Sequence, residues 1–177
     1  PYKTLYTFFI CMIQPLLQSK LFPYTTLFRS KEYTINEASK IAKIGFLEDD
    51  IITGKRIWSE NLFHIFGFNP EDKVPSGKEI LALFDEESRQ RSIEAGIKLD
   101  SEGIPLDIEV KMINLKKEEV WLRIVVHPVY NNQQEIIGRR GIMQDITNAK
   151  KTQNELELSK QKIESTLELA KENEYSL

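Results

Sequence analysis

Few side chains between residues 31 and 177 could take part in catalysis. The clearest pair is His127 and Asp145, which lie on two successive predicted strands. A histidine beside a carboxylate can transfer protons, so a small α+β enzyme that uses these two residues is one hypothesis. No serine, cysteine or lysine is placed beside them as a nucleophile, and the sequence has no glycine-rich phosphate loop. A surface histidine at position 127 and a structural helix cap at position 145 explain both residues without catalysis.

The same sequence offers little to a cofactor. The one cysteine is Cys11, and residues 31–177 contain no thiol. A cysteinyl–flavin adduct and a thioester-linked chromophore both need one, so both are excluded there. Haem would need an axial ligand such as histidine. His64 lies in a mostly apolar run and His127 shares a strand face with Trp121 and Arg123, so haem is not expected. No cysteine and histidine cluster has the spacing of a zinc site, and we expect no metal.

The composition narrows the class of protein. A single cysteine excludes a disulfide framework and favours a reducing compartment, so we expect a cytoplasmic location. The formal net charge is −3, with acidic and basic residues interspersed. A nucleic-acid-binding protein would need a basic face, so we expect no nucleic-acid partner.

The first thirty residues look foreign to the rest of the chain. Residues 21–30 read LFPYTTLFRS, which resembles the in-frame translation of a common sequencing-adapter oligonucleotide. The apolar stretch at residues 5–17 contains Gln14 and Pro15 and is shorter than the ~20 apolar residues of a membrane-spanning helix. We therefore interpret residues 1–30 as a sequencing or assembly artefact and exclude them from the predicted fold.

Helices and two short strands are predicted in the first half of the remaining chain. A helix that caps the domain is expected at residues 31–43, followed by strands at 44–47 and 55–58. Ser59 is expected to cap a short helix that ends at Gly67. Ser76 and Glu79 have the spacing of a capping box, and Asp85 is expected to cap a longer helix that ends at Gly103.

Three antiparallel strands should follow. Apolar residues alternate with polar ones at positions 104–112 and again at 120–126, and the last strand is expected at 136–146. A period of two indicates a sheet with one buried face. The other face of the middle strand carries Trp121, Val125 and Val129, so we expect that something covers it.

A long helix is predicted for the C-terminal segment, since residues 147–177 contain no glycine or proline. Apolar residues recur every seven positions, at Ala149, Leu156, Ile163, Ala170 and Leu177. The matching a positions of this heptad are mostly polar: Gln153, Lys160, Leu167 and Glu174. The pattern is typical of a weak coiled coil, and we expect a homodimer through this helix.

Two sequence motifs resemble the PAS domain family. The run IAKIGFLEDDIITGKRIWSENLFHIFGF, residues 41–68, resembles the opening of a PAS domain, and GRRGIMQDITNAKK, residues 138–151, resembles its closing G…DIT…K segment. The resemblance covers about residues 37–151. One departure is LFDEES at residues 83–88, where the family often has His-Pro-x-Asp. The resemblance implies an α+β PAS fold: a five-stranded antiparallel sheet, helices on one face and a long C-terminal helix.

The resemblance also implies a domain organisation and a function. Residues 44–147 would form the PAS domain and residues 148–177 a linker helix that carries a signal. The parent would be a bacterial sensor such as a histidine kinase or diguanylate cyclase, with an output domain or a further PAS domain downstream. Asp145 and Thr147 would form the junction through which the signal leaves the domain.

A central cavity is the last expectation, and it could hold a small-molecule ligand or be filled by its own side chains. The residues expected to line it are Phe46, Ile57, Phe63, Phe66, Ile80, Ile93, Ile97, Leu106, Ile108, Leu122, Ile124 and Ile142.

Overall fold

The computed structural model describes residues 34–174, with side chains up to residue 168. The expected artefact at residues 1–30 lies outside the described residues. The chain divides into two compact units, with the boundary between Ala42 and Lys43. In the first unit, residues 34–41 are helical, which is the described part of the helix expected at 31–43.

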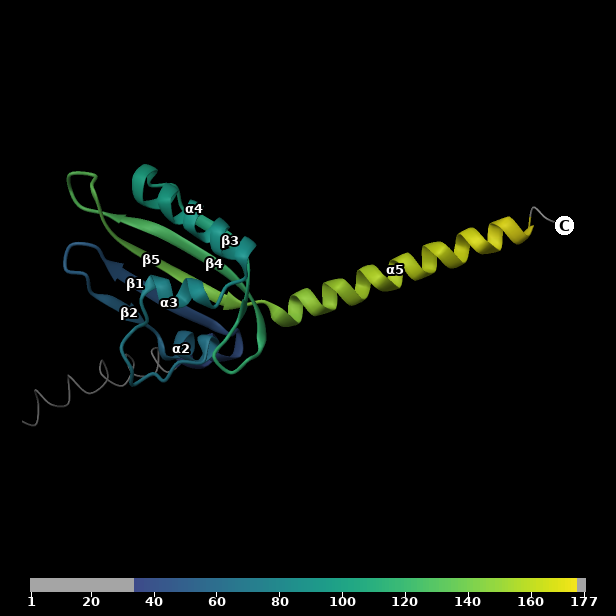
Figure 1. Ribbon diagram of the computed structural model, residues 1–177, viewed down its shortest axis with the longest axis horizontal. Coiled ribbons are helices and arrows are strands. Elements are labelled where there is room, and N and C mark those ends of the chain that lie inside the picture. Colours follow the sequence, from purple (N-terminus) through teal and green to yellow (C-terminus); the bar gives the residue numbers. More distant parts are fainter. Residues whose placement is uncertain (1–33, 175–177) are drawn as a thin grey trace, which may run out of the picture. The chain divides into compact units, whose positions relative to one another are not determined.

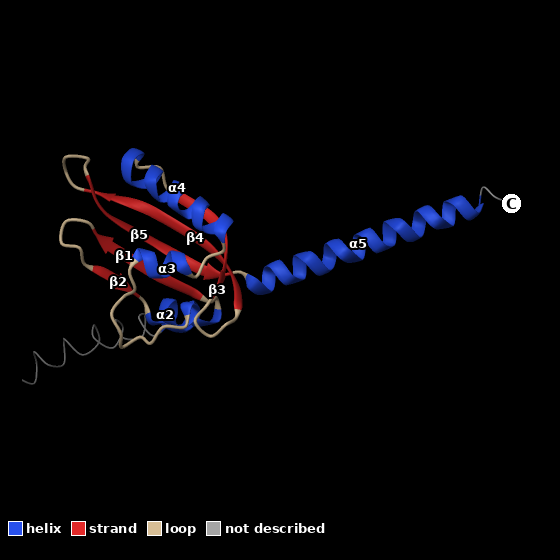
Figure 2. Ribbon diagram, viewed as in Figure 1, coloured by secondary structure: helices blue, strands red, loops and turns tan. Residues whose placement is uncertain are grey.

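The second unit contains one five-stranded antiparallel sheet (Figure 2). Its strands are β1 (Ile44–Asp50), β2 (Arg56–Trp58), β3 (Leu106–Ile113), β4 (Glu119–Tyr130) and β5 (Ile136–Asp145). Their order across the sheet is β2-β1-β5-β4-β3, so the first and last strands in sequence lie side by side at the centre. The prediction of a five-stranded antiparallel sheet is confirmed.

Three helices lie together on one face of the sheet: α2 (Glu60–Phe66), α3 (Gly77–Ala82) and α4 (Glu86–Glu102) (Figure 1). Their ends follow the local sequence. Ser76 and Glu79 form the predicted capping box at α3, and Asp85 accepts a hydrogen bond from the N–H of Ser88 at α4. Gly67 and Gly103 end α2 and α4 with φ of 83° and 68°, a conformation that glycine adopts at little cost.

Ser59 differs from its predicted role as a side-chain cap. It stands at the N-cap position of α2, but its hydroxyl accepts no bond from that helix. The hydroxyl instead accepts a hydrogen bond of 2.9 Å from the backbone N–H of Phe46. The side chain therefore joins the end of β2 to β1.

The hydrophobic core lies between the sheet and these helices. Trp58 packs edge-on against Phe63 at a ring-centroid distance of 5.4 Å, and it packs against Phe66 in a tilted arrangement at 5.1 Å. Leu122 and Val110 from the sheet are fully buried in the same core. Phe63, Phe66 and Leu122 are thus buried as expected, within a solidly packed region.

The opposite face of the sheet carries three residues that were expected inside. Phe46 pairs with Ile142, which in turn pairs with Val125, so these side chains form one row on the face away from the helices. Phe46 is 43% exposed and Ile57 is 48% exposed. The expectation that Phe46, Ile57 and Ile142 line a central cavity is therefore wrong. Their neighbours Leu47, Trp58 and Met143 face the core, because a step of one residue along a strand reverses the face.

The last helix, α5 (Thr147–Glu174), begins two residues after β5 and runs away from the sheet (Figure 1). The side chains of residues 151–168 are all exposed. The helix therefore depends on its first turn for attachment to the domain.

Candidate functional site

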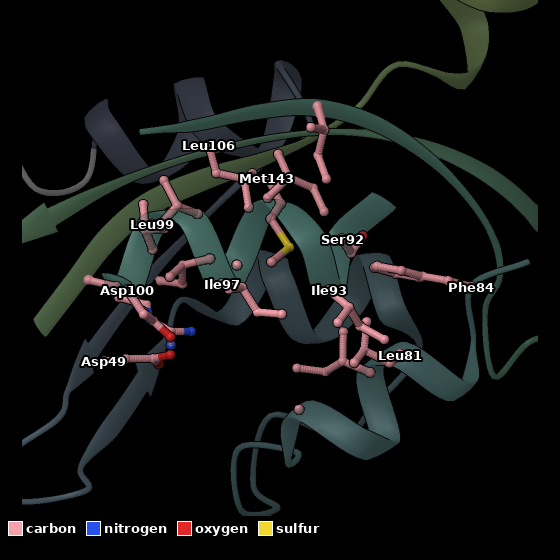
Figure 3. A pocket seen from close by; sticks show the side chains of 18 of the residues that line it. Asp49, Leu81, Phe84, Ser92, Ile93, Ile97, Leu99, Asp100, Leu106 and Met143 are labelled. Atoms are coloured by element: carbon pink, nitrogen blue, oxygen red, sulfur yellow. Dashed lines mark hydrogen bonds and ion pairs between the residues drawn. The ribbon is translucent and has the colours of Figure 1, made fainter. Parts of the chain in front are cut away.

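A cavity of about 320 Å³ lies between the inner face of the sheet and helices α3 and α4 (Figure 3). This volume is at the lower end of the range for small-molecule sites. Most of its lining is apolar, and side chains from the sheet, from both helices and from the segment between the helices contribute to it.

Six of the expected residues lie around this cavity: Ile80, Ile93, Ile97, Leu106, Ile108 and Ile124. Phe63, Phe66 and Leu122 do not line it, because they are packed within the buried core, the two phenylalanines against Trp58. Leu47, Trp58 and Met143 also line the cavity, and the sequence analysis did not predict them. Each is the next residue along a strand from an outward-facing one, so the alternation of side chains identifies it once the outward face of the strand is known.

One end of the cavity is polar, which the sequence interpretation did not foresee. Asp49 lies opposite Arg56 on β2 and opposite Arg139 on β5. Arg56 donates through Nε and Nη2 to the two carboxylate oxygens of Asp49, over 3.1 Å and 3.3 Å. Its Nη1 donates to the carbonyl of Pro75 over 2.8 Å. These contacts fix the Arg56 side chain beside the loop that leads into α3.

A second ion pair crosses the same end of the cavity. Nη2 of Arg139 on β5 donates to Oδ2 of Asp100 on α4. Figure 3 shows Asp49 and Asp100 together at this end, while Leu81 and Phe84 lie toward the other. Two arginines and two aspartates therefore line the cavity, and α4 is linked to the sheet through one of the pairs.

The junction between β5 and α5 is the second candidate site. Oδ1 of Asp145 accepts a hydrogen bond of 2.9 Å from the N–H of Thr147, and Oδ2 accepts one of 3.2 Å from Nζ of Lys43. The N–H of Asp145 donates to the carbonyl of Lys43 over 3.0 Å. Burial raises the pKa of Asp145, but the bonds from Thr147 and Lys43 outweigh it and leave the pKa below its ordinary value.

Thr147 faces the opposite way, toward β4. Its hydroxyl oxygen accepts a hydrogen bond of 3.0 Å from the N–H of Trp121. The N–H of Ile146 donates to the carbonyl of Trp121 over 2.8 Å. The start of α5 is therefore bonded to β4 through Trp121 and to Asp145 at the end of β5, and Asp145 in turn is bonded to Lys43, the residue before β1.

Lys150 adds a third attachment one turn into α5. Its ammonium lies 2.6 Å from Oε2 of Glu109 on β3 and 5.3 Å from the ring centroid of Trp121. A cation over an aromatic ring is attracted by the ring quadrupole. Lys150 thus connects the first turn of α5 to the neighbouring strands β3 and β4.

The two residues of the enzyme hypothesis are not brought together. His127 lies opposite Arg140 on β5, five residues along the strand from Asp145, which corresponds to about 17 Å. The acid–base pair of His127 and Asp145 is therefore excluded by the strand register. The other histidine, His64, is exposed on α2, with Nε2 at 3.4 Å from Oε1 of Glu60.

Within residues 34–174 no group of histidine, cysteine, aspartate and glutamate side chains has the geometry to hold a metal ion. In the same part of the chain, no helix is both long and apolar enough to cross a membrane.

Comparison with solved structures finds the same fold in sensor proteins. A sensory box histidine kinase/response regulator from Burkholderia thailandensis matches with a TM-score of 0.58 and 18% identity, over 73% of this chain and 96% of that chain. The N-terminal domain of a diguanylate cyclase with PAS/PAC sensor from Marinobacter aquaeolei matches with a TM-score of 0.52 and 18% identity, over 58% and 94%. A domain of a putative light and redox sensing histidine kinase from Haloarcula marismortui also scores 0.52 at 18% identity, over 64% and 98%.

No curated protein matches the sequence. A family model of the PAS domain, however, matches residues 56–148, which is more than half of the chain. The matched segment contains most of the sheet, helices α2 to α4 and the junction with α5. The sequence match and the shared fold lead to the same assignment: this chain belongs to the PAS domain family, whose members are sensory modules.

Proposed function

We propose that this chain is a sensory and relay module of a larger signal-transduction protein, of the two-component or cyclic-dinucleotide type. In this proposal, ligand binding or a conformational change in the PAS domain alters the position of α5. The helix then passes the change to an output domain or to a further PAS domain. The observation that carries the proposal is the hydrogen bond between Thr147 and Trp121, which joins α5 to strand β4 of the sheet.

The cavity and the junction share one strand. Ile124 and Val126 of β4 line the cavity. Trp121 lies on the same strand, three residues from Ile124, which corresponds to about 10 Å. A shift of β4 that accompanies occupation of the cavity would therefore act directly on the bonds that hold Thr147 and Lys150. The exposed helix beyond residue 151 would amplify a small rotation at its base.

Dimerisation through α5 completes the proposal. Leu156, Ile163 and Leu167 are between 56% and 61% exposed, and the heptad pattern places them along one side of the helix. Burying such side chains against a second copy would stabilise a two-stranded coiled coil, although Gln153 and Lys160 at a positions would weaken it. Trp121, Val125 and Val129 on the sheet would add to the interface.

A distance measurement tests the relay. Spin labels attached at Asn132, in the β4–β5 turn, and at Ser159, on α5, report the direction of the helix relative to the sheet in a Cys11→Ser background. Thr147→Val is expected to shift or broaden the distance distribution, because it removes the acceptor that holds α5 to β4. Thr166→Val, on the exposed part of α5, is the control and should leave the distribution unchanged. An unchanged distribution in Thr147→Val would refute the proposed coupling.

A further inference from the structure

Arg139 has one buried hydrogen-bond donor without a partner among the described residues. The residue lines the polar end of the cavity, where its Nη2 donates to Asp100. Its Nε is buried and makes no hydrogen bond within the described part of the chain. A buried donor that stays unsatisfied is unfavourable, so this atom is suited to an acceptor supplied from the cavity.

Two other arginines in the domain show the fuller, bidentate use of this side chain. Arg56 and Arg123 each donate through both Nε and Nη2 to the two oxygens of one aspartate. Arg139 uses only Nη2, so half of the same edge of its guanidinium is free for another acceptor.

Charge at this end of the cavity favours an uncharged head group. Arg56 and Arg139 are balanced by Asp49 and Asp100, so the four side chains together are neutral. A carboxylate would bring a third negative charge into a largely apolar cavity and would compete with Asp100 for Arg139. An amide or ketone oxygen would accept from Nε and leave both ion pairs intact.

The rest of the cavity is suited to a hydrocarbon body. Ile93 and Ile97 line it from α4, yet they are 45% and 60% exposed. A molecule that lies along α4 from the Asp100 end toward Phe84 would cover apolar surface on both isoleucines (Figure 3).

We infer that the cavity binds a small amphipathic molecule with an apolar body and an uncharged head, whose acceptor oxygen is recognised by Nε of Arg139. This inference rests on the proposed sensory function and specifies the chemical class of its ligand. Asp100 retains its bond to Nη2 in the bound state, so the link between α4 and β5 is kept while the cavity fills.

Nuclear magnetic resonance titration with two matched probes tests the inference. Hexanamide and hexanoate have the same hydrocarbon chain and differ in the charge of the head. Hexanamide is expected to shift the Arg139 Nε–H resonance together with the methyl resonances of Ile93 and Ile97. Hexanoate at neutral pH should bind about tenfold more weakly, which corresponds to about 1.4 kcal/mol.

Substitutions of two adjacent arginines distinguish recognition by the Nε–H group from an effect of positive charge alone. Arg139→Lys keeps a cation for Asp100 but removes the Nε–H group, and it should weaken hexanamide binding about fivefold. Arg140→Lys is the control, because Arg140 is the next residue on β5 and pairs with Glu48 on the other face of the sheet. It should leave the affinity unchanged.

Three results would overturn the inference: no binding of hexanamide, tighter binding of hexanoate, or unchanged hexanamide affinity in Arg139→Lys. If that variant fails to fold, the shift of the Arg139 Nε–H resonance in the wild-type protein tests the contact independently. Binding as described, without any change in the distance between the labels at Asn132 and Ser159, would instead contradict the proposed relay and leave the ligand class standing.

Discussion

The hydroxyl oxygen of Thr147 accepts a hydrogen bond of 3.0 Å from the backbone N–H of Trp121. The two residues are 26 positions apart in sequence, and the bond joins the first residue of α5 to β4. Thr147 is only 9% exposed, so water has little access to replace it. The contact therefore contributes to stability and to the direction of the helix at once.

Thr147→Val should lower the free energy of unfolding by about 1–3 kcal/mol, because it leaves the N–H of Trp121 without its acceptor. Urea denaturation measures the change. Thr166→Val is the matched control, since its hydroxyl bonds within the exposed part of α5. Its effect should stay within about 0.5 kcal/mol. Equal effects of the two substitutions would contradict a special role for the junction.

Stability should fall in acid partly through Asp145. Burial raises its pKa, but the bonds from Thr147 and Lys43 outweigh burial and keep the folded pKa below the unfolded value of about 3.9. The ionised group therefore stabilises the fold above the unfolded pKa, and this contribution is lost as the pH falls through the folded pKa. The free energy of unfolding in urea should therefore fall between pH 6 and pH 3, and it should fall less for Asp145→Asn than for the wild type. The same difference in both proteins would count against this assignment.

Two glycines should respond to alanine with opposite signs. A Cβ at Gly141 on β5 would collide with the carbonyl oxygen of Val125, so Gly141→Ala should destabilise the domain by about 1–3 kcal/mol. A Cβ at Gly96 on α4 meets no atom within 4 Å. Gly96→Ala should therefore stabilise the domain by about 0.5–1 kcal/mol through the lower entropy of the unfolded chain. Thermal denaturation of the two variants checks both signs.

Ile163→Asp should abolish dimerisation if α5 forms the interface, because it places a charge at a d position of the heptad. Ser165→Asp introduces the same charge two residues away on the outward side and should leave the association constant nearly unchanged. Sedimentation equilibrium measures both. A dimer that persists in Ile163→Asp would place the interface elsewhere.

Much of the fold follows from local sequence. Alternation in residues 104–112 and 120–126 identified the buried face of β3 and β4, since a regular period of two over several residues leaves one arrangement that covers the apolar side. The capping box at Ser76 and the cap at Asp85 also depend only on residues three positions apart. The opening motif and the closing motif with Asp145 and Thr147 together indicated the fold family, which the family match confirms.

The face of the first strands was decided by tertiary packing. In β1, Phe46 and Leu47 are both apolar, so the strand could turn either one inward. A Cβ at Gly45 would lie 2.7 Å from that of Leu62, so α2 packs closely against this position. Gly45 and Leu47 are two residues apart and share the inner face, which turns Phe46 outward. The three-residue strand β2 is too short for its own pattern to resolve Ile57 from Trp58.

The polar end of the cavity and the partners of the junction also required the three-dimensional structure. Asp49, Arg56, Asp100 and Arg139 come from three strands and a helix, and strand register together with the position of α4 brings them to one place. Sequence determined which residues share a local face because that depends on backbone periodicity. Tertiary structure decided which faces meet, since contacts between residues as distant as Arg139 and Asp100 depend on how the whole sheet and its helices pack.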